Sequence, residues 1–118
     1  MEEFKVEKVI QDIYTDVSLG GCGRLNKDGH HLRTGWQGDK TVTIFTDSKY
    51  MGIPRFLYGG LLASLNDCHG SGSAALALHH KNGHEIGDGA EPPRFVTANL
   101  NVDFLKPTPQ HVPLKAIG

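Results

Sequence analysis

The residues of this chain that could carry out chemistry gather in its longest apolar stretch. If that stretch is one helix, Ser64, Asp67 and Ser71 are spaced by three and four positions and form a single polar stripe. Gly59 and Gly60 then stand in the first turn, where unpaired backbone N–H groups and the helix dipole favour a developing negative charge. The spacing therefore predicts a carboxylate on a polar stripe and, at the start of the helix, N–H groups able to stabilise a developing oxyanion.

An exposed surface stripe is the alternative explanation for a generic helical aspartate. Gly70 and Gly72 argue against it, because each glycine inside a helix costs about 1 kcal/mol relative to alanine. Close approach of a backbone or a ligand would explain both glycines. Eight positions separate Gly59 from Asp67, so one substrate reaches both only by lying along the helix or by binding between two chains.

Other catalytic signatures are absent from the sequence. Neither Ser71 nor Ser73 is the centre of a G-x-S-x-G motif, Gly21-Cys22-Gly23 lacks the third glycine of a dinucleotide-binding loop, and no Walker A lysine occurs. We therefore expect no cofactor.

Three imidazoles, those of His79, His80 and His84, fall near the predicted end of the helix. There is no HExxH motif and Gly83 interrupts the helical register, so a solvated helix end is favoured over a metal site. The expectation is that the protein binds no metal.

The two cysteines, Cys22 and Cys68, lie in a chain whose N-terminus is too acidic for a secretory signal. This favours two free thiols over a disulfide. For Cys22, between two glycines, an ordinary loop cysteine is favoured over a reactive thiol.

The elements that would position these residues follow from periodicity. An amphipathic helix is predicted over about 3–14, and the long helix from Tyr58 or Gly59 to Asn82, with Gly83 as its C-terminal cap. The sequence also predicts strands over 30–37 and 41–47 joined by a turn at Gly38-Asp39, a strand over 94–105, and a last strand that starts at Val112.

Length and composition narrow the class of protein. The 118 residues fit one domain, 1–118, and carry a formal net charge of −1 with no large Lys/Arg cluster. Nucleic acid is therefore not an expected partner. No apolar run is long enough to span a bilayer, so no membrane association is expected and the cytoplasm is the default location.

Three segments resemble a known family in order and spacing. Y-G-G-L-L-A-S-L-N-D resembles the H-G-G-x-x-x-x-L-x-D segment of the PaaI-like hotdog-fold acyl-CoA thioesterases. VTANLNVDFLKP resembles that family's V-T-x-x-L-x-V-x-F-L-[KR]-P segment, and GCGRLNKDG resembles the lead-in of a subgroup. The agreement runs from Gly21 to Pro109.

The resemblance implies an α+β hotdog fold, a long central helix wrapped by an antiparallel β-sheet, in a homodimer or homotetramer. It implies that Asp67 acts as base or nucleophile, and that the Gly59 N–H polarises the thioester carbonyl across the dimer interface. Ser71 matches a position whose hydroxyl holds the water, and Thr97 a hydroxyl position facing the site. The substrate-binding residues expected on this basis and from the polar stripe are Tyr58, Gly60, Ser64, Ser71 and Thr97.

Two departures from the family pattern stand out. Tyr58 replaces the usual histidine, which puts turnover or substrate preference in question. A hotdog sheet also needs two further strands after Gly118, so we expect either a truncated chain lacking its C-terminal strands or an unusual arrangement of the sheet.

The leading hypothesis is hydrolysis of an acyl-CoA or acyl-carrier-protein thioester. The alternative is a non-catalytic hotdog domain that binds acyl-CoA or another apolar ligand. A hotdog dehydratase ranks lower because the helix has no D-x-N-x-x-H-type pair, and a plain interaction domain is the remaining option.

Overall fold

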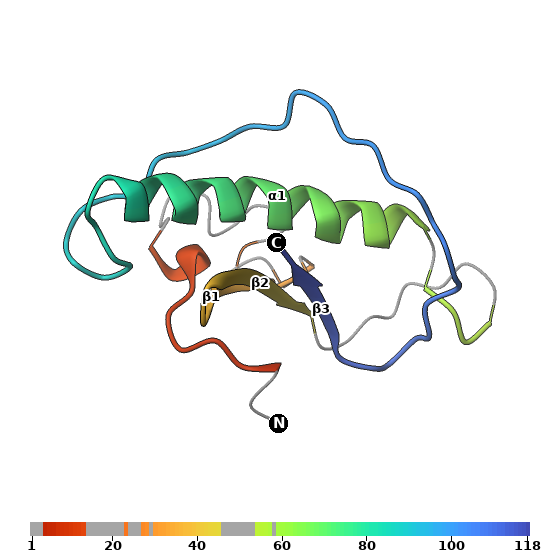
Figure 1. Cartoon of the computed structure of the whole chain (residues 1–118). Coiled ribbons are helices and arrows are strands. Elements are labelled where there is room, and N and C mark those ends of the chain that lie inside the picture. Colours follow the sequence, from red (N-terminus) through yellow and green to blue (C-terminus); the bar gives the residue numbers. More distant parts are fainter. Residues whose placement is uncertain (1–3, 14–22, 24–26, 29, 46–53, 58) are drawn as a thin grey trace.

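A computed structural model describes residues 4–13, 23, 27–28, 30–45, 54–57 and 59–118. Its elements are a 3-10 helix η2 (Ile10–Asp12), strands β1 (Arg33–Gln37), β2 (Lys40–Phe45) and β3 (Leu114–Ile117), and one helix, α1 (Gly59–Lys81). The strands form an antiparallel sheet in the order β1-β2-β3, and α1 lies across one face of it (Figure 1). The predicted α+β architecture, a long helix on an antiparallel sheet, is confirmed.

The helix α1 begins at Gly59, as predicted, and ends at Lys81, one residue before the predicted Asn82. Gly83 has φ 85° and its N–H donates to the His80 carbonyl at 2.9 Å, while the N–H of His84 donates to the His79 carbonyl at 3.0 Å. This pair of bonds is a Schellman motif, which glycine favours because it adopts a positive φ without steric cost. Among the described helices, none has both the length and the apolar character to cross a membrane.

The β1–β2 hairpin also forms as predicted. Gln37 pairs with Lys40 across the turn, and Gly38 at its first central position has φ 67°. β2 is the central strand, since its other edge pairs with β3 from Val42↔Ile117 to Phe45↔Leu114. The predicted last strand therefore exists, although it starts at Leu114 rather than Val112.

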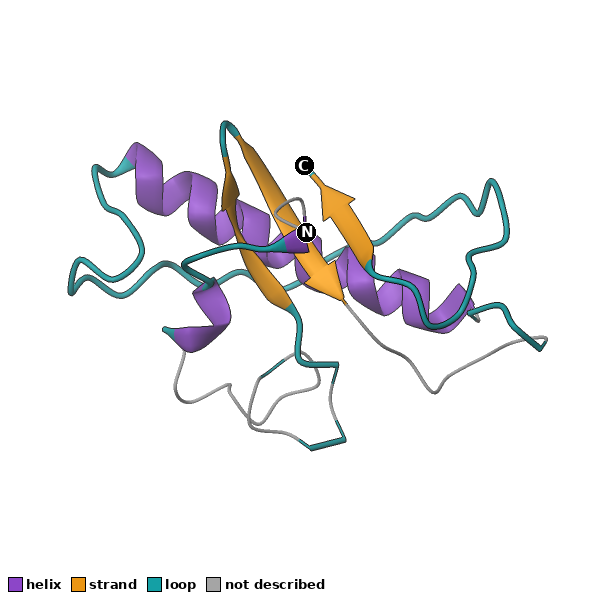
Figure 2. Cartoon of the chain, turned by 90° about the horizontal axis from the view of Figure 1, so that it is seen from below, coloured by secondary structure: helices purple, strands orange, loops and turns teal. Residues whose placement is uncertain are grey.

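The two faces of the sheet bury different clusters, because side chains alternate along a strand. On the α1 face, Phe45 packs with residues of the helix and of the segment before it; this cluster is Leu32, Phe45, Leu57, Leu61 and Leu65. On the opposite face, Val42 and Ile44 pack with Val6 and Val9 of the N-terminal segment, which crosses the strands on that side (Figure 2). The sheet is thus covered on both faces.

The predicted amphipathic helix over 3–14 is wrong for its described part. Ile10–Asp12 is a short 3-10 helix, no α-helix forms over 4–13, and Val9 is extended at φ −120°, ψ 142°. The valines of this segment are β-branched and reach the sheet from an extended path, so tertiary packing overrides the helical spacing. Gly35 of β1 makes this path possible, because a Cβ there would overlap the Lys8 carbonyl oxygen.

The predicted strand over 94–105 is also wrong. These residues form no strand and run along the side of α1 that faces away from the sheet, seen as the blue arch over the helix in Figure 1. A strand requires a hydrogen-bonded neighbour, and no described strand lies on that side of α1. The arch is tied down after its end, where Leu57 N–H donates to Thr108 O and Gln110 N–H donates to Arg55 O, both at 2.9 Å.

Candidate functional site

Asp67 and Thr97, two of the predicted site residues, are in direct contact. The Thr97 hydroxyl donates a hydrogen bond to Oδ1 of Asp67, which is half-buried on α1. Both residues line a cavity of about 420 Å³ between α1 and the arch. Its walls are Asn66, Asp67, Gly70, Ser71 and Ala74 from the helix and residues 95–100 from the arch.

Ser71 lines the same cavity one turn after Asp67. Its hydroxyl lies 3.3 Å from the backbone carbonyl oxygens of both Asp67 and Cys68, and it donates to them. Bonding back to the preceding turn is the usual behaviour of serine inside a helix, and it fixes the orientation of the Ser71 oxygen.

Gly59 and Gly60 occupy the first two positions of α1, as expected. The ring of Phe104 lies against Gly59, where an added Cβ would be 3.2 Å from Cζ. Because a helix rises ~1.5 Å per residue, Gly59 and Asp67 are roughly 12 Å apart along the axis. One chain therefore does not bring the two together at a single carbonyl.

Two further predicted residues stand apart from this cavity. Ser64 is half-buried in α1 and is not among the described residues that line the cavity. Tyr58 lies outside the described residues. Phe104 was missed by the sequence interpretation, although it belongs to the L-x-V-x-F-L-K-P segment that indicated the family.

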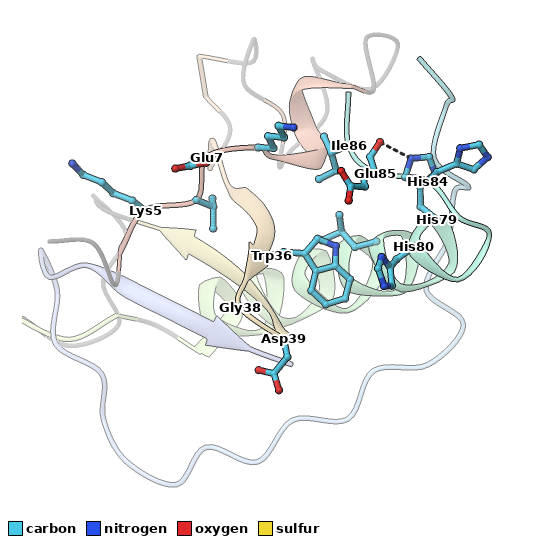
Figure 3. Close-up of a pocket in the computed structure, with 13 residues that line it drawn as sticks. Lys5, Glu7, Trp36, Gly38, Asp39, His79, His80, His84, Glu85 and Ile86 are labelled. Carbon is cyan, nitrogen blue, oxygen red and sulfur yellow. Dashed lines mark hydrogen bonds between the residues drawn. The ribbon is translucent and has the colours of Figure 1, made fainter. Parts of the chain in front are cut away.

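A larger cavity of about 690 Å³ lies at the other end of α1, against the tip of the hairpin (Figure 3). The rings of Trp36 and His80 form part of its wall with centroids 5.7 Å apart. It is remote from Asp67. Of the two cavities, that of Asp67 is the better candidate for hydrolysis, because it holds a carboxylate already oriented by a hydroxyl donor.

The histidines at the end of α1 serve the loop that follows the helix. His79 is only 3% exposed and its Nε2 lies 3.3 Å from the Glu85 carbonyl oxygen, so the expectation of a solvated helix end is wrong there. His84 Nδ1 contacts Asp88 Oδ2 at 2.9 Å. The described residues contain no group of three or more His, Cys, Asp or Glu side chains placed to hold a metal ion.

Asp88 caps this loop with its carboxylate. The backbone N–H of Ala90, the His84 side chain and the N–H of Glu85 all bond to it, and together they lower the pKa of Asp88 to about 2. These bonds favour the charged form of the carboxyl group.

Cys68 follows Asp67 on α1 and is disulfide-bonded. The expectation of a free thiol at this position is therefore wrong. The pattern of charges at the N-terminus was too weak a guide to the redox state of the cysteines. Cys22 lies outside the described residues.

Comparison with known proteins gives a match to a solved structure. No family model matches the chain, and no curated protein sequence does so either. A crystal structure of a thioesterase superfamily protein from Shewanella loihica PV-4 is 44% identical, with a TM-score of 0.57. The match covers 73% of this chain, which spans 65% of the length of that protein. At this identity, and with the long helix on an antiparallel sheet that the structure shows, the chain belongs to the thioesterase superfamily and has its hotdog fold.

Proposed function

We propose that this protein is a PaaI-like thioesterase that hydrolyses an acyl-CoA or acyl-carrier-protein thioester, with Asp67 as base or nucleophile. The observation that carries the proposal is the hydrogen bond from Thr97 to Asp67 Oδ1 inside a cavity. Membership of the thioesterase superfamily supports the reaction class.

The hydrogen bond to Thr97 occupies only one of the two carboxylate oxygens of Asp67. Thr97 engages Oδ1, and no other side chain in the described part of the chain bonds to the carboxylate. Oδ2 is therefore available to orient a water molecule or to approach a carbonyl carbon directly. A carboxylate whose rotamer is already fixed loses little freedom when the substrate binds, which favours either role.

The oxyanion donor in this proposal is the Gly59 N–H of a second copy of the chain. The roughly 12 Å between Gly59 and Asp67 along α1 supports a site shared by two chains rather than one. Large apolar side chains on the arch are exposed, since the exposed fraction is 93% for Val96, 88% for Leu105 and 56% for Phe104. Exposed apolar patches of this kind mark protein interfaces, which also supports a second chain packed against the arch. A homodimer, or a homotetramer built from two such dimers, would bury them.

The role of Asp67 is tested with Asp67→Asn, which keeps the shape of the side chain and its bond to Thr97 but removes the charge. Release of free thiol from a panel of acyl-CoAs is expected to fall by about 10²- to 10⁴-fold, the usual contribution of a general base. Asp39→Asn, in the exposed hairpin turn, is the matched control and should keep full activity. An Asp67→Asn protein as active as wild type would contradict the assignment. Wild type that binds acyl-CoA without releasing thiol would favour the non-catalytic alternative.

The shared site is tested by mixing two inactive variants. Gly59→Pro removes the N–H at the first helical position, where proline is tolerated. If Asp67 of one chain works with Gly59 of the other, a mixed dimer of Asp67→Asn and Gly59→Pro chains contains one intact site. Random mixing should then restore about a quarter of wild-type activity in a two-fold symmetric dimer. No recovery, with mixed dimers verified by mass, would show that each chain uses its own Gly59.

A further inference from the structure

A row of polar side chains is buried where α1 meets the sheet, on the side of the helix away from the Asp67 cavity. Thr34 and Thr43 of the sheet are 0% exposed and His69 of α1 is 9% exposed. Gln11 Nε2 donates to Thr34 Oγ1 at 2.8 Å, the two threonine hydroxyls are 2.9 Å apart, and Thr43 Oγ1 lies 2.8 Å from His69 Nδ1. Four side chains from three parts of the chain are thus joined in one line.

The direction of every bond in this row is set at its Gln11 end. The backbone N–H of Thr34 can only donate, and it donates to Gln11 Oε1 at 2.7 Å. The amide NH₂ of Gln11 must therefore be the group that faces the Thr34 hydroxyl. Thr34 Oγ1 accepts from Gln11, and the acceptor that the described contacts offer to its own proton is Thr43 Oγ1. Thr43 in turn donates to His69 Nδ1.

The other side of the imidazole agrees with this direction. With Nδ1 accepting, the ring proton of neutral His69 is on Nε2, and the Ile117 backbone carbonyl of β3 acts in favour of the protonated ring. Ser73 Oγ, one turn further along α1, lies 3.3 Å from Nδ1 and adds a second donor to the same lone pair. Burial lowers the pKa of His69, partly opposed by the Ile117 carbonyl, so the ring is neutral at neutral pH. The two hydroxyls face the ring from β2 and α1, the Ile117 carbonyl from β3, and Gly118 lies against Nε2, where an added Cβ would be 2.9 Å away.

We propose that Gln11 determines the tautomer of His69 through Thr34 and Thr43. This series of hydrogen bonds, which all run in the same direction, fixes the position of α1 on the sheet, on the side of the helix opposite Asp67. His69 is a positioning residue in this scheme. It is two positions from Asp67, which is more than half a turn around the helix, so a helix held at His69 presents Asp67 to the arch. The link to catalysis rests on the proposed thioesterase function, whereas the control of the tautomer does not.

The sharpest test is Gln11→Glu, observed through the ¹⁵N resonances of the His69 ring. A carboxylate still accepts from the Thr34 N–H but cannot donate to the Thr34 hydroxyl, so both threonine protons must reverse. Thr43 then accepts from His69 Nδ1–H, while the Ile117 carbonyl still favours the protonated ring. His69 should become doubly protonated, with an upward shift of its titration midpoint relative to wild type. In wild type, Nε2 should be the protonated nitrogen and Nδ1 the bare one.

The matched control is Gln37→Glu, the same chemical change at the end of β1. Gln37 contacts the Lys5 carbonyl and the Lys115 ammonium group and is not part of the row. This variant should leave the His69 resonances unchanged. A wild-type spectrum with Nδ1 protonated would overturn the proposal, and that measurement does not depend on any variant folding. Equal His69 spectra in wild type and a folded Gln11→Glu protein would overturn it as well.

The positioning role of His69 is tested with Thr43→Val, which removes the hydroxyl that links Thr34 to His69 and keeps the shape of the side chain. We expect kcat for thioester hydrolysis to fall about tenfold with KM within twofold, because a misplaced catalytic group loses rate rather than binding. Thr43→Ser, which restores the hydroxyl, should recover most of the rate. Equal kcat for all three proteins would refute the positioning role. If wild type has no thioesterase activity, the proposed function fails while the ¹⁵N result still decides the control of the tautomer.

Discussion

Thr97 donates a hydrogen bond to Asp67 across thirty positions of sequence, and this bond joins the arch to α1 at the candidate site. It brings together a hydroxyl and a carboxylate that the sequence analysis assigned to the same site from separate segments. The contact makes the arch part of the site instead of a passive connection between α1 and β3.

The first prediction concerns this hydroxyl. Thr97→Val removes the donor at nearly constant volume and frees the Asp67 carboxylate to rotate. Thioesterase kcat should fall by roughly tenfold, the scale expected when a catalytic group loses its orientation. Steady-state kinetics with free-thiol detection measures it. Thr97→Ser should retain most of the activity, and a valine variant as fast as the serine variant would show that the bond has no role in turnover.

Substitution of the two interior glycines of α1 by alanine should change the free energy of unfolding in opposite directions. A Cβ at Gly72 would lie 3.0 Å from Cγ2 of Thr34, a side chain held in place by its bonds to Gln11 and Thr43. Gly72→Ala should therefore destabilise the protein by about 1–3 kcal/mol through overpacking. A Cβ at Gly70 meets nothing within 4 Å, so Gly70→Ala should stabilise it by up to about 1 kcal/mol through helix propensity. Urea denaturation of the pair gives the two signs, and a stabilising Gly72→Ala would contradict the close helix–sheet contact.

The free energy of unfolding should depend on pH through His69. Burial lowers the pKa of His69 in the folded state below its value of about 6.5 in the unfolded chain. The unfolded state therefore takes up the proton first, so the stability contribution is complete above pH 6.5 and is lost as the pH falls towards the folded pKa. Denaturation curves between pH 8 and pH 5 test this at about one-unit intervals. Because burial and His31 lower the pKa of His30 in the same direction, His30→Gln is the control that isolates His69.

The backbone amides of the loop after α1 should lose their protection against hydrogen exchange only in strong acid. The pKa of Asp88 is about 2 because Ala90 N–H, His84 and Glu85 N–H bond to its carboxylate. A lowered pKa in the folded state means that this contribution is present above about pH 4 and is lost as the pH falls through about 2. Amide exchange at Ala90 and Glu85 measures it. Asp88→Ala, which has no acceptor, should remove the protection already at neutral pH, and unchanged exchange in that variant would rule out the cap.

Elements defined by local sequence could be predicted from the chain. The turn at Gly38, the Gly83 cap and the apolar run of α1 are each fixed by neighbouring residues, and all three match the structure. Elements that depend on distant partners could not. The valines near the N-terminus have helical spacing but follow the sheet, and residues 94–105 alternate like a strand without a described strand beside them.

The residues of the candidate site likewise include some that the sequence predicts and some that only the fold brings together. Asp67 and Thr97 were predicted, and they do meet. His69 was passed over because a single histidine in an apolar helix gives no signal of its own, and only the fold shows that Thr34 and Thr43 face it. Its nearest partner on the sheet, Thr43, lies 26 positions away, beyond the reach of any local pattern.

The packing of the N-terminal segment on β2 has a consequence for the order of folding. Val6 and Val9 leave the ribosome before Val42 and Ile44, which make the surface that they cover. The two valines therefore stay exposed to solvent until the β1–β2 hairpin has been synthesised and has formed. The hairpin, whose contacts are local, is then the first element able to form, and the N-terminal segment docks afterwards as a late step of folding.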